Sequence, residues 1–166
     1  MSKTIIITGA SSGIGFALAE YFGKKGNKVY GLSRKVVNSD YFVSIPTDIT
    51  EKEQIDNAIS EILKVETRID VLINNAGMGM VGAVEDSTKE DISKLFNLNL
   101  IGSVQMMTAV LPKMREQKLG KIINVSSIGS EMGLPFRGFY SASKSALDKV
   151  TEAMRYEVYP WNIHVC

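Results

Sequence analysis

The chain has 166 residues, of which 45% are hydrophobic and 22% are charged, and these proportions predict a globular protein with a sizeable buried core. Nineteen Lys and Arg against 18 Asp and Glu leave a formal net charge of +1, which argues against nucleic acid or an anionic membrane as a partner. The single cysteine, Cys166, leaves no internal disulfide and no metal-ligand cluster, as expected for a protein of the reducing cytoplasm.

Short runs of β-branched and apolar residues alternate with longer amphipathic segments. The predicted strands are residues 4–7, 28–32, 41–46, 71–74, 121–126 and 162–165. The predicted helices are residues 14–25, 52–65, 87–116 and 140–158. The first apolar run is too short for a signal peptide or a membrane span. The alternation predicts a single α/β domain over residues 1–166, with a doubly wound parallel sheet between two helical layers, as in the Rossmann fold.

The long helix over residues 87–116 has a recognisable beginning. Ser87 precedes Glu90 by three residues, which is the spacing of a capping box. We therefore expect Ser87 to begin this long and mostly helical segment.

A glycine-rich segment, Thr8-Gly9-Ala10-Ser11-Ser12-Gly13-Ile14-Gly15, joins the first strand to the first helix. Glycine allows a tight turn and a close approach of the backbone to a ligand, and the free amides at a helix start attract negative charge. The segment therefore predicts a phosphate site, although a glycine-rich turn alone is also compatible with a simple strand-to-helix connection.

Tyr140 and Lys144 are four residues apart in a predicted helix and so share one face of it. A phenol keeps its proton up to about pH 10, and a nearby ammonium favours the phenolate, so such a pair is suited to acid–base chemistry. Ser127, thirteen residues before Tyr140, is the candidate third member. Ser126 is the competing hydroxyl, and strand alternation would send the two to opposite sides.

Taken together, these motifs resemble the short-chain dehydrogenase/reductase family, and the resemblance extends over the whole chain. The glycine segment matches the cofactor signature of that family. Asp48 and Ile49 follow the third strand, where the family has an Asp near the adenine ring, and Asn75-Ala76-Gly77 matches its motif after the fourth strand. Asn99 corresponds to the helix asparagine of the family, whose exposed backbone carbonyl holds a water in a proton relay.

The resemblance implies reversible hydride transfer between a nicotinamide cofactor and a carbonyl or secondary alcohol. Tyr140 would donate the proton, Ser127 would hold the substrate oxygen, and Lys144 would bind the ribose and assist Tyr140. The implied cofactor-binding residues are Thr8, Gly9, Ser11, Ser12, Gly13, Ile14, Gly15, Ser33, Arg34, Asp48, Ile49, Asn75, Ala76, Gly77, Tyr140 and Lys144.

The end of the second strand indicates which dinucleotide is preferred. A carboxylate there would accept bonds from the NAD ribose, but the sequence offers Ser33, Arg34 and Lys35 instead. Arg34, with Ser11 nearby, would bind a 2′-phosphate, so we expect NADP(H) to be favoured over NAD(H). The alternative is that Arg34 and Lys35 form a solvated basic loop.

Family members are usually longer, and this chain ends within its sixth strand, before the family's substrate-covering segment and last strand. We therefore expect an incomplete form with an open, apolar edge at residues 162–165, which leaves a noncatalytic binding module as the alternative function. By analogy with the family, helices 87–116 and 140–158 would pair with a second copy, giving a homodimer or homotetramer. The substrate is a small molecule, and the one readable part of its pocket wall, residues 128–139, is mostly apolar.

Overall fold

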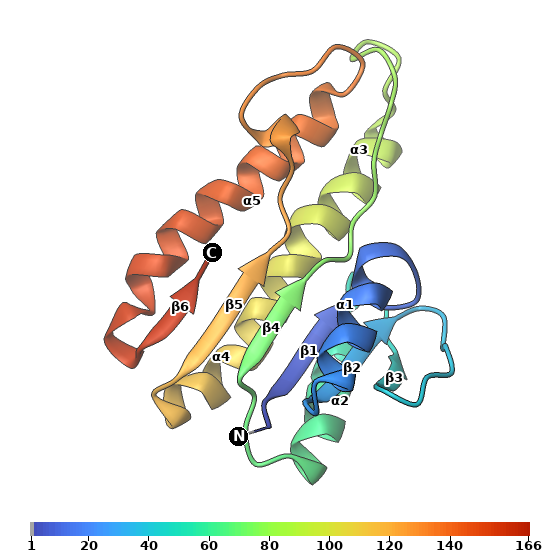
Figure 1. The fold of residues 1–166 in the computed structure, drawn as a ribbon. Coiled ribbons are helices and arrows are strands. Elements are labelled where there is room, and N and C mark those ends of the chain that lie inside the picture. Colours follow the sequence, from blue (N-terminus) through green and yellow to red (C-terminus); the bar gives the residue numbers. More distant parts are fainter. Residues whose placement is uncertain (1) are drawn as a thin grey trace.

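In a computed structural model, which describes residues 2–166, six parallel strands form one sheet (Figure 1). The strands are β1 (Thr4–Thr8), β2 (Lys28–Ser33), β3 (Val43–Pro46), β4 (Val71–Asn74), β5 (Gly120–Asn124) and β6 (Ile163–Val165). Their order is β3-β2-β1-β4-β5-β6, so the chain reverses direction across the sheet between β1 and β4. Ligands of doubly wound sheets bind at such a switch point, outside the carboxyl ends of the strands.

Helices cover both faces of the sheet, which confirms the expected fold class. They are α1 (Gly13–Lys24), α2 (Lys52–Val65), α3 (Lys89–Phe96), α4 (Ser103–Gln117) and α5 (Gly138–Glu157), with a 3-10 turn η2 (Ile128–Ser130) before α5 and another, η3 (Tyr159–Trp161), after it. Alternate residues of β1 separate the two layers: Ile6 belongs to the core shared with α2, α4 and α5, whereas Ile5 and Ile7 belong to the core shared with α1.

The helices are divided unevenly between the two faces of the sheet. Within residues 2–166, α1 is the one helix that packs on one face, whereas α2, α4 and α5 belong to the core on the other. On the face with α1, the paired residues Lys121 of β5 and His164 of β6 are exposed. β6 forms the edge of the sheet, as expected, but Ile163 and Val165 are buried in the core shared with α5. The predicted edge strand is therefore present, but its apolar side chains point towards a helix and not into solvent.

The predicted helix 87–116 is three segments and not one. A π-helical stretch, η1 (Asn97–Gly102), separates α3 from α4. The capping residue is Thr88, whose hydroxyl accepts from the Asp91 backbone amide, while the Ser87 hydroxyl donates to the Ala83 carbonyl. The predicted capping box at Ser87 was wrong because the chain enters the helix one residue later.

By length and composition alone, the 29 residues of Lys89–Gln117 could cross a membrane. Their apolar character has another physical explanation in this fold. Met106, Met107 and Met114 are fully buried against the sheet, as in the core helix of a globular domain.

A polar cluster lies at the amino ends of the strands, far along the sheet from the glycine loop. Glu66, at the end of α2, accepts hydrogen bonds from the Tyr30 hydroxyl at 2.9 Å and from Lys28 Nζ at 2.8 Å. The Thr4 hydroxyl lies 3.5 Å from the same carboxylate. The cluster joins β1, β2 and α2 at this end of the molecule.

Candidate active site

The glycine loop leaves the start of α1 open to a ligand. Gly9 and Gly13 adopt φ values of +69° and +57°, which disfavour residues with a Cβ. A Cβ on Gly15 would lie 2.4 Å from the Gly9 carbonyl oxygen, so the loop and helix meet only because that atom is absent. Ser12 is the N-cap but makes no side-chain capping bond. The positive end of α1 is thus free of a side-chain cap.

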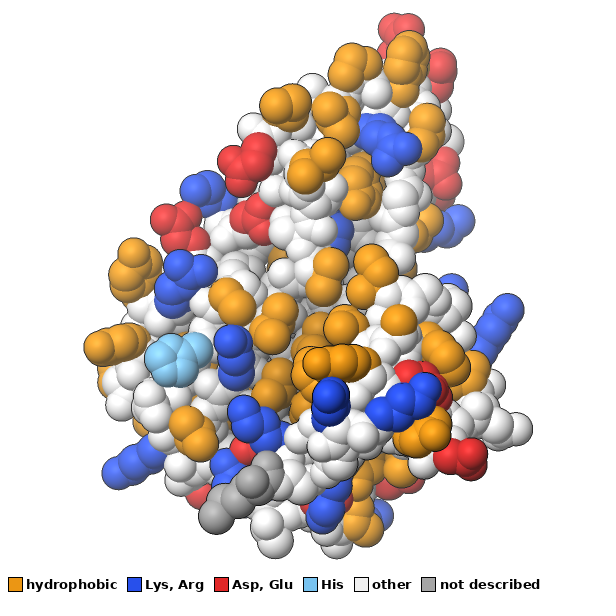
Figure 2. Space-filling view, viewed as in Figure 1, with side chains coloured by type: hydrophobic (Ala, Val, Ile, Leu, Met, Phe, Trp, Pro, Cys, Tyr) orange, Lys and Arg blue, Asp and Glu red, His pale blue; other side chains and the backbone are white. Residues whose placement is uncertain are grey.

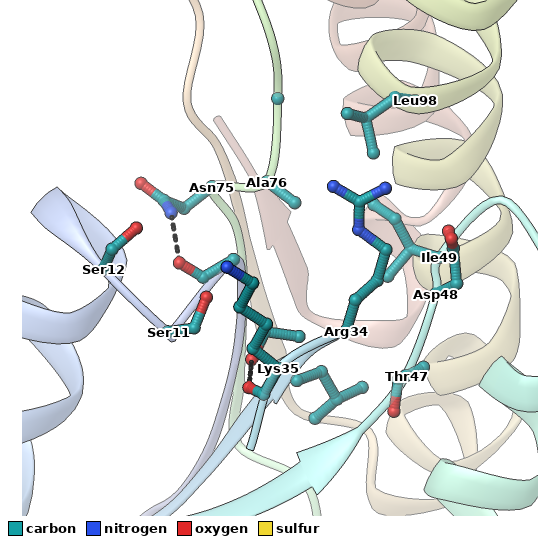
Figure 3. A pocket seen from close by; sticks show the side chains of 14 residues that line it. Ser11, Ser12, Arg34, Lys35, Thr47, Asp48, Ile49, Asn75, Ala76 and Leu98 are labelled. Carbon is teal, nitrogen blue, oxygen red and sulfur yellow. Dashed lines mark hydrogen bonds between the residues drawn. The ribbon is translucent and has the colours of Figure 1, made fainter. Parts of the chain in front are cut away.

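The loop after β4 is fastened to the loop after β1. Thr8 Oγ1 accepts from the backbone amides of Asn75 and Ala76, both at 3.0 Å, and Asn75 Nδ2 donates to the Thr8 carbonyl at 3.0 Å. Thr8 is fully buried. These bonds hold Asn75 and Ala76 against the glycine loop, and Figure 3 shows a further bond, from Asn75 Nδ2 to the Gly9 carbonyl.

A cleft of about 570 Å³ opens at the carboxyl ends of β1 to β4. It is lined by Gly9, Ser11, Ser12, Leu32, Ser33, Arg34, Lys35, Thr47, Asp48, Ile49, Asn75, Ala76, Gly77 and Leu98. Most of the predicted cofactor residues therefore share one cavity. Leu32 and Leu98 were not predicted, because an apolar strand or helix residue carries no local sign that it faces a cavity. Thr47, which directly follows β3, was also not predicted.

Ser33 and Asp48 are among the polar side chains of the cleft that are already bonded within the protein. Ser33 Oγ donates to the Lys35 carbonyl at 2.7 Å, and Asp48 Oδ1 accepts from the amide and hydroxyl of Thr50. By contrast, Arg34 and Lys35 are exposed and form no ion pair within residues 2–166. The Arg34 side chain extends across the cleft towards Leu98 (Figure 3).

Lys144 lies one turn below Tyr140 in α5 and is 6% exposed. Its ammonium donates to the Val125 carbonyl at 2.7 Å. Burial lowers the pKa of Lys144, and Asp148 partly opposes that shift. A Cβ on Gly77 would lie 3.7 Å from Lys144 Nζ, so this ammonium borders the inner end of the cleft.

Ser127 is positioned by a turn and not by a strand. β5 ends at Asn124, so the predicted strand 121–126 was too long and alternation does not separate Ser126 from Ser127. Ser127 caps η2, its Oγ accepting from the Gly129 amide at 3.1 Å, whereas the buried Ser126 hydroxyl has no partner within residues 2–166.

The turn η2 packs on the first turns of α5. A Cβ on Gly129 would lie 3.5 Å from Ser127 Oγ and 3.3 Å from Ser141 Oγ, next in the chain to Tyr140. Ser145 Oγ also donates to the Ser130 carbonyl. Ser127 is thereby held near the start of α5, where Tyr140 is half-buried.

Asn99 has a different environment from the expected one. It is fully buried in η1, and its carbonyl accepts from the Ser103 hydroxyl at 3.3 Å, so this oxygen is not exposed as predicted. Its amide accepts from the Met78 backbone amide and donates to the Met78 carbonyl, both at 2.9 Å, and donates to Ser143 Oγ. The side chain therefore joins η1, the loop after β4 and α5.

Comparison with known proteins gives a consistent result. The family described as short chain dehydrogenase matches residues 3–166. The chain is 48% identical over 165 residues to 3-ketodihydrosphingosine reductase of Bacteroides thetaiotaomicron, covering 99% of this chain and 61% of that protein. It is 37% identical to NAD-dependent glycerol dehydrogenase of Listeria innocua, covering 98% of the chain and 67% of that relative. The solved structure "ElxO with NADP bound" superposes with a TM-score of 0.94 at 30% identity, over 99% of this chain and 71% of the other.

Proposed function

The chain belongs to the short-chain dehydrogenase family, and from this premise we propose that it transfers hydride between NADP(H) and a carbonyl or secondary alcohol. The observation that carries the proposal is the meeting of the cleft and α5 at Gly77, which lines the cavity and lies beside the Lys144 ammonium. One end of a dinucleotide in the cleft would therefore reach the candidate acid–base group. Because the chain spans 61% of the length of one relative and 67% of the other, the activity is proposed for the whole protein.

The residues present fit a dinucleotide. The uncapped start of α1 and the left-handed Gly9 and Gly13 form a cradle for a pyrophosphate, and a Cβ on Gly13 would project into open space. A cavity of about 570 Å³ is of the size that small-molecule sites have. Asp48 and Ile49 would lie at the adenine end. When bound, the nicotinamide supplies the hydride donor or acceptor.

Three side chains of this chain would serve the reaction. Tyr140 would donate its hydroxyl proton to the oxygen that gains negative charge during reduction, and Ser127 would hold that oxygen by a hydrogen bond. The Lys144 ammonium would bind the ribose next to the nicotinamide and favour the tyrosinate. Asn99 acts as a positioning residue, because its side chain is fully engaged with Met78 and Ser143.

Replacement of Tyr140 tests the reaction. Tyr140→Phe is expected to lower kcat for reduction of simple ketones about 100- to 10,000-fold, since the proton donor is lost, and to leave the Kd for NADPH nearly unchanged. Tyr156→Phe, on an exposed ring of the same helix, is the matched control and should retain full activity. Full turnover by Tyr140→Phe would rule out the proposed acid.

The preference for NADP(H) rests on Arg34, whose guanidinium has no ion-pair partner among the described residues. The planar guanidinium group of an arginine can bind a phosphate through two parallel hydrogen bonds. Arg34→Ala should weaken NADPH binding about 10- to 100-fold, and NADH, which lacks the 2′-phosphate, serves as the control ligand. Equal Kd values for NADPH and NADH in the unaltered protein would contradict the preference.

A noncatalytic nucleotide-binding module is the second candidate. One feature favours it: the Lys144 ammonium donates to the Val125 carbonyl, so one of its hydrogen bonds is already used within the protein. Tight NADPH binding without turnover of any ketone or aldehyde would select this alternative.

We also propose a cytoplasmic location and a homodimer through α4 and α5. Light scattering of the purified protein tests the homodimer.

A further inference from the structure

Two loops beside the candidate active site lack polar side chains. Residues 76–84 and 132–136 consist entirely of Ala, Gly, Val, Met, Leu, Pro and Phe, and charged residues flank the second loop. Several of these side chains are well exposed, and we refer to them together as the apolar rim: Met78, Val81, Val84, Met132 and Phe136. An exposed apolar patch of this kind marks a ligand or partner site more often than chance.

The two loops start at the site and meet beyond it. The first follows Gly77, which lines the cleft, and the second follows η2, which Ser127 caps. They are joined by a hydrogen bond from the Gly82 amide to the Phe136 carbonyl at 2.9 Å. In Figure 2, hydrophobic side chains gather over this tapering end of the molecule.

The second loop reaches back to the candidate catalytic serine. A Cβ on Gly129 would lie 3.5 Å from Leu134 Cδ1 and 3.5 Å from Ser127 Oγ, so an apolar side chain and the serine share one small region. A substrate oxygen bonded to Ser127 would therefore have hydrocarbon surface directly beside it.

There is also room for a ligand along these loops. A Cβ built on Gly79, Gly82 or Gly133 would meet nothing within 4 Å. These glycines are thus not required by close packing, and the space above them is open.

We propose that the substrate carries a hydrocarbon substituent of several carbons next to its reacting carbonyl or alcohol carbon, and that this substituent packs on the apolar rim. The inference rests on the proposed function and specifies the substrate class of the same site. The rim offers no side-chain donors or acceptors, so the hydroxyls of a sugar or polyol would lose their water without gaining partners. An alkyl chain would gain free energy with every methylene that leaves water.

Methionine methyl groups allow the test to be made by NMR on the purified protein with NADP⁺ bound. Met78 and Met132 are in the rim, whereas Met106, Met107 and Met114 are fully buried and serve as internal controls. A homologous series of methyl alkyl ketones is expected to bind about fourfold more tightly for each added methylene and to shift the rim methyl signals selectively. Dihydroxyacetone should neither bind nor shift them.

A pair of variants assigns the effect to the rim. The double variant Val81→Thr with Met132→Gln should flatten the dependence of Kd on ketone length, because it places polar atoms where the chain packs. Val65→Thr is the matched control, since Val65 is 69% exposed and Val81 70%, and it should leave the dependence unchanged.

The outcomes separate this inference from the proposed reaction. Affinity that is independent of ketone length, or rim signals that do not respond, would overturn the inference even if small carbonyls are reduced. Length-dependent binding at the rim without any NADPH oxidation would support the rim as a hydrocarbon site and overturn the proposed reaction. The methyl signals of Met78 and Met132 could instead be unaffected by ketones and change when the protein is diluted. That result would assign the rim to a contact with a second copy of the chain and overturn the inference.

Discussion

The Lys144 ammonium combines two opposing influences in one side chain. Burial in α5 lowers its pKa, whereas Asp148 acts in the opposite direction. The ammonium also donates a hydrogen bond to the Val125 carbonyl, directly after β5. A lowered pKa means that the neutral amine becomes favoured at a lower pH than for an ordinary lysine. If the proposed reaction needs the ammonium, activity should fall at alkaline pH before an exposed lysine would lose its charge.

The titration of Lys144 can be observed directly by NMR of isotope-labelled lysine side chains. Lys144 should titrate at a lower pH than Lys149 on the same helix, whose ammonium bonds to Glu152 and has a raised pKa. Lys144→Met identifies the signal by its disappearance. Titration of both lysines at the same pH would contradict the effect of burial.

Some site residues could be predicted because their information is local in the sequence. The glycines of one tight turn lie close together whatever the rest of the fold. Tyr140 and Lys144, four residues apart, likewise lie close together in any α-helix. The partners of these residues could not be predicted, since Val125 lies 19 residues from Lys144 and Met78 lies 21 residues from Asn99. Contacts of that kind depend on how whole strands and helices pack.

Among the elements, α2 and β4 have the predicted limits, whereas the long helix does not. The apolar periodicity of α2 matches a straight helix on a sheet, so spacing alone places it. Residues 97–102 are also compatible with an α-helix by composition, and the wider turn of η1 follows from tertiary bonds of the buried Asn99. Helix propensities do not distinguish a π-helical turn from an α-helical one. A π-helical turn within a helix often marks a functional site.

The start of α3 gives a stability prediction. Thr88→Ala should lower the free energy of unfolding by about 1 kcal/mol, because the Asp91 amide loses its capping acceptor. Chemical denaturation would measure the change. Ser87→Ala is the control, and a larger loss for Ser87→Ala than for Thr88→Ala would restore the capping box that the structure contradicts.

On the scale of the whole molecule, the parallel sheet separates two polar regions. The candidate active site occupies the carboxyl ends of the strands, and the Glu66 cluster occupies the amino ends. Burial raises the pKa of Tyr30 to about 12, and the hydrogen bond to Glu66 acts in the same direction.

This shift predicts an alkaline limit to stability. A tyrosine whose folded pKa is raised stabilises the fold below its ordinary value of 10.0, and that contribution is lost as pH rises towards about 12. The free energy of unfolding should therefore decline over this interval, and Tyr30→Phe should decline less steeply. Denaturant titrations at a series of alkaline pH values measure both slopes, and parallel slopes would rule out Tyr30 as the cause.

Under our proposal, the side chains that would select the substrate and the Glu66 cluster that joins β1, β2 and α2 lie at opposite ends of the sheet. Libraries that randomise the solvent-facing Val81 and Met132 would sample new selectivities while the Glu66 cluster stays intact. Because the two regions share no side chain, substitutions in the apolar rim should change ligand preference with little effect on the free energy of unfolding.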